Sequence, residues 1–173
     1  MKGTIAKCLA EMITERFGQD RWENILQTAG LSPDSRFLAT QNVDDGVILK
    51  VVDSACSVLN LSLAQVADAF GDYWGTVYAP RIYGAFYETA QSAREFLLKM
   101  DDVHVTMTRA ISDAHPPRFE YEWQDDKTLI MKYQSLRGLI DFVAGLAKGV
   151  GKYYKEDLHV TRLGSDRVKI VFP

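Results

Sequence analysis

Apolar residues recur every three or four positions along the first two thirds of the chain, which is the spacing of amphipathic helices. In the first such segment Ile5, Leu9 and Phe17 share one face, and a glycine stands where the pattern stops. The pattern predicts helices at about residues 2–18, 20–29, 44–60, 62–74, 79–89 and 93–111. Pro116 and Pro117 follow the last of these segments and cannot continue a helix.

Beyond the two prolines the apolar period changes to two, which is typical of strands with one solvated face. Residues 118–124 and 129–135 alternate in polarity around an Asp-Asp-Lys turn, and residues 158–163 and 167–172 do so around Gly-Ser-Asp. Helical spacing returns between these hairpins, at about residues 136–154. The order of elements predicts an α+β fold, in which a helical N-terminal subdomain packs on a C-terminal four-stranded antiparallel sheet with inserted helices.

The bulk composition indicates a globular domain and excludes several classes of protein. The chain has 173 residues, of which 47% are hydrophobic and 25% are charged, so it is long enough to bury a core. The net charge is only -3 and the basic residues are scattered, unlike those of a nucleic-acid binder. No apolar run approaches the roughly 18 to 20 residues of a membrane span, so we expect a cytoplasmic protein without membrane insertion. Cys8 and Cys56 lack the spacing of a redox or zinc motif and are expected to be buried, reduced thiols.

One histidine is unusual because it lies on an apolar helix face. His104 is accompanied there by Met100, Val103 and Met107. A neutral imidazole in such a place is costly unless its nitrogens find partners. The helix alone favours a core histidine that bonds to a carbonyl or to the Asp101 carboxylate. The alternative is an axial ligand, since haem iron is often held by one proximal histidine in an apolar pocket.

A second group of polar side chains lies at the end of the second predicted strand. Tyr133, Ser135 and Arg137 occupy alternate positions, which share one face in an extended chain. A planar guanidinium matches a carboxylate, and the phenol and the hydroxyl add neutral donors. The run therefore predicts a cradle for an acid group, although it also fits a solvated strand face. Because haem carries two propionates, such a cradle and His104 would bind the same cofactor, the cradle at its acid groups and the histidine at its iron.

Together these residues resemble the haem nitric oxide and oxygen binding domains, the H-NOX family, which includes the haem domain of soluble guanylate cyclase. The similarity covers essentially the whole chain and rests on the segments MKGTI, FGDYW, REFLLKMDDVH, PPRF and YQSLR. It implies a single domain over residues 1–173, with a helical distal subdomain at about 1–65. Residues from about 66 to 173 would supply the haem ligand and the propionate motif, and haem b (iron protoporphyrin IX) would be buried between the two parts.

The resemblance also implies roles for individual residues. His104 would be the proximal iron ligand, and Tyr133, Ser135 and Arg137 would bind the propionates. Pro117 would press on one pyrrole and bend the macrocycle, a role compatible with ending a helix. Three further side chains are expected to pack against the haem: Ile5, Met100 and Leu146.

The distal side of the pocket would decide which gas is bound. Family members that bind oxygen stably have a tyrosine where this chain has Phe142, and its hydroxyl donates to the bound oxygen. Such a bond is worth about 1.5 to 3 kcal/mol. Without it, we expect the pocket to bind NO and CO and to exclude oxygen. Trp74 and Tyr78, which fall near the distal pocket, remain alternative donors.

As a function, the resemblance implies a gas sensor and not an enzyme. NO would release His104 from the iron and let the haem relax, and a separate partner would read the change, since the sequence ends directly after the last predicted strand. By resemblance, that partner would be a histidine kinase or a cyclic-di-nucleotide signalling enzyme. A different class also fits: an apolar-pocket protein that binds a carboxylate-bearing small molecule or lipid, which would not need His104. No nucleophile and base pair indicates catalysis, and Asp101 and Asp102 are interpreted as a solvated helix turn.

Overall fold

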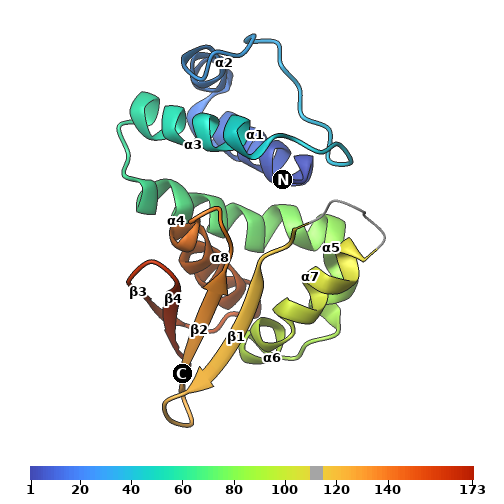
Figure 1. The fold of residues 1–173 in the computed structure, drawn as a ribbon, viewed down its shortest axis with the longest axis vertical. Helices are drawn as coiled ribbons and strands as arrows, with labels where there is room; N and C mark the ends of the chain where they lie inside the picture. Colours follow the sequence, from blue (N-terminus) through green and yellow to red (C-terminus); the bar gives the residue numbers. More distant parts are fainter. Residues whose placement is uncertain (110–114) are drawn as a thin grey trace. The chain divides into compact units, whose positions relative to one another are not determined.

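A computed structural model describes residues 1–109 and 115–173 (Figure 1). These residues form two compact units, residues 1–70 and residues 71–173. Helices precede a four-stranded antiparallel sheet, so the predicted α+β class is confirmed. The subdivision expected at about residue 65 stays a prediction.

The first unit is helical. Its elements are α1 (Gly3–Phe17), α2 (Gln19–Thr28), α3 (Asp45–Leu59) and the first part of α4 (Leu63–Tyr73). Two of these helices begin at side-chain caps that satisfy the free amides of the first turn. The Asp44 carboxylate accepts bonds from the amides of Gly46 and Val47, and the Ser62 hydroxyl accepts one from Gln65. The caps explain why both helices begin close to the predicted positions.

The second unit starts inside a long helical run. α4 continues into a π-helical turn, η1 (Trp74–Tyr78), and then into α5 (Ala79–Glu88), whereas the sequence pattern predicted two separate helices. Here η1 contacts α8 (Ile140–Tyr154), and glycines from both elements meet. A Cβ at Gly75 of η1 would lie 2.5 Å from the carbonyl carbon of Gly149 on α8, so only glycine permits this close approach.

The predicted helix that begins after Ser92 is not continuous. It divides at Lys99 into α6 (Ala93–Leu98) and α7 (Met100–Thr108). Ser92 caps α6 as expected, since its hydroxyl accepts a bond from a first-turn amide. The prediction of one uninterrupted helix is therefore wrong, and its expected end near Ile111 lies outside the described residues.

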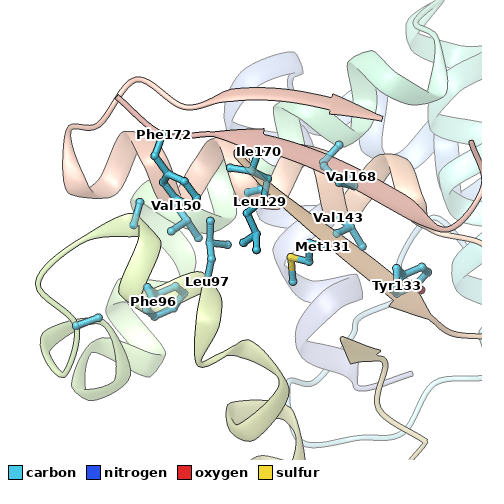
Figure 2. Packing of buried hydrophobic residues seen from close by; sticks show 14 of the residues in the cluster. Phe96, Leu97, Leu129, Met131, Tyr133, Val143, Val150, Val168, Ile170 and Phe172 are labelled. Carbon is cyan, nitrogen blue, oxygen red and sulfur yellow. The ribbon is translucent and has the colours of Figure 1, made fainter. Parts of the chain in front are cut away.

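The sheet contains both predicted hairpins. Its strands are β1 (Arg118–Trp123), β2 (Thr128–Gln134), β3 (His159–Leu163) and β4 (Arg167–Val171), in the order β1-β2-β4-β3. The inward side chains of β2 and β4 join α6 and α8 in one apolar core. Figure 2 shows this core: Leu97, Leu129, Met131, Val143, Val150 and Ile170 are among its members. Burial on one face explains the period of two in the strand sequences.

Within the described ranges, no single helix is long and apolar enough to cross a membrane. α3 and the helical run Leu63–Glu88 have the necessary length and composition only when taken together across a sharp bend.

Candidate functional site

The His104 ring has one satisfied nitrogen and one that remains an acceptor. His104 lies half-buried on α7, and its Nδ1 is 2.7 Å from the carbonyl oxygen of Met100, one turn earlier. Since a carbonyl can only accept, Nδ1 carries the proton and donates. In a neutral imidazole the other nitrogen, Nε2, then keeps its lone pair. The carbonyl partner considered for a core histidine is present, and this same bond prepares Nε2 to ligate a metal.

The surroundings of His104 keep the ring neutral. Burial lowers the pKa of His104, while the Met100 carbonyl and the Asp101 carboxylate act in the opposite direction. Neutral imidazole is the form that binds metals. Across the described part of the chain, no three His, Cys, Asp or Glu side chains are grouped so that they could hold a metal ion.

The first turn of α7 is fastened to β1 by Asp101. Its carboxylate accepts bonds from Arg118 Nε at 2.8 Å and Nη2 at 2.7 Å, and from the amide of Phe119 at 2.9 Å. These donors, led by Arg118, lower the pKa of Asp101 to about 2. The interpretation of Asp101 as part of a solvated turn is wrong, because this carboxylate joins a helix to a strand.

Phe119 connects the two groups of residues that the sequence singled out. Its ring centroid lies 5.5 Å from that of His104 and 5.9 Å from that of Tyr133, its direct partner across the β1–β2 ladder. Sequence reasoning did not identify Phe119 as a site residue. The period of two placed it on the inward face of the strand, but no local pattern indicates that α7 packs there.

Strand β2 ends within the Tyr-x-Ser-x-Arg motif. Tyr133 is buried within β2, whereas Ser135 and Arg137 follow the strand in a turn. The prediction that all three share one extended face is therefore wrong. The Ser135 hydroxyl accepts a bond from the Arg137 amide at 3.3 Å, and Arg137 Nη1 donates to the His115 carbonyl at 2.8 Å. This bond ties the turn to the segment that contains Pro117, which is half-buried.

The residues expected on the distal side come from two elements in contact. Trp74 and Tyr78 lie on η1, while Phe142 and Leu146 lie on α8. Tyr78 and Phe142 are buried, and the rings of Trp74 and Tyr78 stack with centroids 5.5 Å apart. Phe142 and Leu146 are one helical turn apart and so share a face of α8. Ile5 is half-buried on α1 in the first unit.

A separate cavity of about 500 Å³ lies beside α7. It is lined by Val105, Thr106, Thr108, Arg109, His115, Pro116 and Arg118. His104 does not line this cavity, because its imidazole faces Phe119 and the sheet. The cavity is therefore no guide to the position of the histidine's ligand.

Cys8 and Cys56 are both reduced thiols, as expected. Cys8 is buried and Cys56 is half-buried, so full burial holds for the first only. Burial, with help from the Asp53 carboxylate, raises the pKa of the Cys56 thiol.

Comparison with known proteins agrees with this architecture. A model of the Haem-NO-binding (HNOB) family matches residues 2–162. The soluble guanylate cyclase gcy-32 of Caenorhabditis elegans is 26% identical over 159 residues, which are 88% of this chain and 23% of that protein. The chain thus spans less than a quarter of the length of this curated relative.

Solved structures show the same fold. The crystal structure of an oxygen-binding H-NOX domain related to soluble guanylate cyclases, in its oxygen complex, has a TM-score of 0.82 at 22% identity. That alignment covers 99% of this chain and 95% of the other. The Fe(II) unliganded A71G mutant of the H-NOX protein from K. algicida has a TM-score of 0.87 at 18% identity, covering 100% and 97%. Since the family model spans nearly the whole sequence, this chain belongs to the Haem-NO-binding, or H-NOX, family of haem-binding gas-sensor domains.

Proposed function

We propose that this chain is a gas sensor that binds NO and CO at a ferrous haem b held by His104, and that it excludes oxygen. One observation carries the proposal: His104 Nδ1 donates to the Met100 carbonyl, so Nε2 of a neutral ring is the available ligand. When bound, haem would supply an iron that binds a diatomic gas. The surrounding residues then hold the cofactor and select the gas.

The acid groups of the cofactor would be bound at the end of β2. The Tyr133 hydroxyl, the Ser135 hydroxyl and the Arg137 guanidinium are the donors that we propose for the propionates. The turn after the strand supports this role, because it brings the backbone amide of Arg137 to the Ser135 hydroxyl and so orders the motif. Pro117, Ile5, Met100 and Leu146 would supply apolar contacts to the porphyrin.

The exclusion of oxygen would follow from the lack of a hydroxyl at position 142. Phe142 is buried and has no hydroxyl, and a hydrogen bond to bound oxygen is worth about 1.5 to 3 kcal/mol. Trp74 and Tyr78 are the alternative donors. Among the described residues, no buried side-chain nitrogen or oxygen lacks a hydrogen-bond partner.

Signalling would begin with the release of His104. On binding of NO, His104 would be released as a ligand, α7 would be free to move relative to β1, and Pro117 would bear on the relaxing cofactor. A partner would read this movement in the cytoplasm. We propose a histidine kinase or a cyclic-di-nucleotide signalling enzyme as the partner. Similarity to a soluble guanylate cyclase makes a guanylate cyclase a third candidate for the partner.

Substitution of the ligand tests the assignment. His104→Gly should lose the haem absorption band, and added imidazole should restore it by occupying the vacated position. His159→Gly is the matched control, because His159 is exposed on β3 and should leave haem binding unchanged. Undiminished haem binding in His104→Gly without imidazole would contradict the proposal. It would instead favour the alternative pocket for a carboxylate-bearing molecule, which does not need this histidine.

Spectra of the reduced wild-type protein under nitrogen, CO, NO and air test selectivity and release. NO and CO should each change the spectrum, whereas air should not produce a stable oxygen complex. A stable oxygen complex would refute the proposed selectivity. If His104 stayed bound to iron in excess NO, the release mechanism would be wrong.

A further inference from the structure

At the break between α6 and α7, the hydroxyl of a tyrosine side chain replaces one backbone hydrogen bond of the helix. In a continuous helix the Asp101 amide would donate to the Leu97 carbonyl, four residues earlier. Instead, the Tyr121 hydroxyl accepts from the Asp101 amide at 3.2 Å and donates to the Leu97 oxygen at 3.0 Å. At the same point the Lys99 amide donates to the Phe96 carbonyl at 3.1 Å, which closes a tighter turn.

The sequence of the helix does not by itself require this break. Neither proline nor glycine occurs between residues 93 and 109, and Lys99 has φ −87° and ψ −5°, without a left-handed conformation. Insertion of a side chain into the backbone ladder is a known cause of a kink. Because the other usual causes are missing here, Tyr121 accounts for the position of the break.

Strand β1 of the sheet places Tyr121 at the break. It lies on the inward face of β1, opposite Met131 of β2, and Figure 1 shows β1 beside α6 and α7. Burial raises the pKa of Tyr121 to about 12, so the group stays a neutral hydroxyl that can both donate and accept. Phe119, two residues earlier on the same face, contacts the His104 ring. One strand therefore contacts both the break and the histidine.

We propose that Tyr121 is a positioning residue: its hydroxyl keeps the helix broken at Lys99 and thereby sets the direction in which α7 presents His104. This inference rests on the proposed role of His104 as the iron ligand. α7 has no fully buried residue, and the bonds that Tyr121 and Asp101 make at its first turn fasten it to β1. Without the hydroxyl, the Leu97 carbonyl and the Asp101 amide would pair directly, and α6 would continue into α7.

Tyr121→Phe tests the proposal, because it removes the hydroxyl and keeps the ring. A crystal structure of the variant should show a direct bond from the Asp101 amide to Leu97 and a helix without the break at Lys99. In the ferrous protein, resonance Raman should show a shifted iron–histidine stretching band. The ratio of released to bound His104 at a fixed NO concentration should change on the order of fivefold, as expected for one hydrogen bond.

Tyr154→Phe is the matched control. It also removes a half-buried phenol that donates to a carbonyl, that of Tyr87 at 2.6 Å, and its pKa is likewise raised to about 12. Its iron–histidine band and its response to NO should equal those of the wild type. If both variants shift the band equally, the effect of Tyr121 is general destabilisation and the positioning role is refuted.

Two further outcomes separate this inference from the proposed function. If His104→Gly loses haem but Tyr121→Phe keeps the helix break and the wild-type band, only the role of Tyr121 is refuted. If His104→Gly keeps haem, the proposed function fails and the inference fails with it. If Tyr121→Phe does not fold, 3-fluorotyrosine at position 121 replaces it. The fluorine weakens the hydroxyl as an acceptor, so the band should again shift, and an unshifted band would overturn the proposal.

Discussion

α7 and α8 both carry candidate site residues and both contact the sheet, but they are held in different ways. α8 has nine buried residues and meets η1 at a glycine crossing. α7 has no buried residue and is fastened by hydrogen bonds at its first turn. Apolar burial contributes roughly 1.5 to 3 kcal/mol for each large side chain, whereas a hydrogen bond contributes about 1 kcal/mol net.

The difference indicates which element can move. Segments with few buried apolar contacts open at low free energy, while well-buried helices remain fixed until the whole domain unfolds. We therefore interpret α8 as the frame of the site and α7 as its movable part. This division suits a sensor, since the proposed ligand to iron lies on the movable helix and the proposed gas-selecting residue lies on the frame.

The largest expected effect comes from the glycine crossing. A Cβ at Gly149 would lie 1.9 Å from the carbonyl oxygen of Gly71, which is on α4 just before η1, so Gly149→Ala should push α8 away from the α4–η1 run. We expect a loss of several kcal/mol in the free energy of unfolding. Gly84→Ala is the control, because nothing lies within 4 Å of that Cβ, and it should be neutral or stabilise α5. Equal stability of the two variants in denaturant unfolding would contradict the frame role of α8.

The second largest effect is expected from a hydrogen-bond donor introduced at position 142 of α8. If Phe142 faces the bound gas as proposed, Phe142→Tyr should raise oxygen affinity by about 1.5 to 3 kcal/mol, or roughly ten- to a hundredfold. Oxygen titration of the ferrous protein measures this change. NO affinity should change far less, because NO binding depends less on that bond. An unchanged oxygen affinity would mean that residue 142 does not reach the gas.

A pair of valines tests the comparison directly. Val150 on α8 is buried, whereas Val105 on α7 is 40% exposed. Val150→Ala should lower the free energy of unfolding by about 2 kcal/mol, because it removes buried methyl groups and leaves a cavity. Val105→Ala should change it by less than about 0.5 kcal/mol. Urea unfolding of both variants gives the two values, and similar losses would show that α7 is held like α8.

The smallest expected effect is electrostatic and depends on pH. The pKa of Asp101 falls from 3.8 to about 2 on folding, so this carboxylate stabilises the protein above pH 3.8 and loses its effect as pH falls towards 2. Asp101→Asn should therefore be less stable than the wild type at neutral pH, on the order of 1 kcal/mol because its partner Arg118 is largely exposed. The difference should diminish near pH 2. A difference independent of pH would contradict the ion-pair role, and Asp102→Asn, at an exposed neighbour, is the control.

Sequence reasoning recovered most elements because their causes are local. Helix caps such as Asp44 and Ser92 are satisfied within their own first turn, and alternation in β1 and β2 reflects burial of one face. The candidate ligand His104 was also visible locally, as a polar residue on an apolar helix face. These features require only a few neighbouring residues, so the linear order contains them.

Other features of the candidate site depend on contacts between distant segments. The Phe119 ring joins His104 to Tyr133 across α7, β1 and β2, and the Arg137 side chain reaches the His115 carbonyl. Neither pairing leaves a periodic signal in the sequence. The predicted orientation of the Arg137 side chain was wrong because β2 ends at Gln134, and strand alternation does not extend beyond that residue.

By itself, the sequence determined the fold class, the two hairpins, the helix starts and the two groups of polar residues that indicate a haem site. Only the tertiary structure decided where the helix before His104 breaks, since the cause is a phenol from β1, more than twenty residues beyond Lys99. It also decided that α7 is held by polar bonds and α8 by burial. The physical reason is the same in both cases: periodicity records which face of an element is apolar, and the partner of that face is known only once the chain has folded.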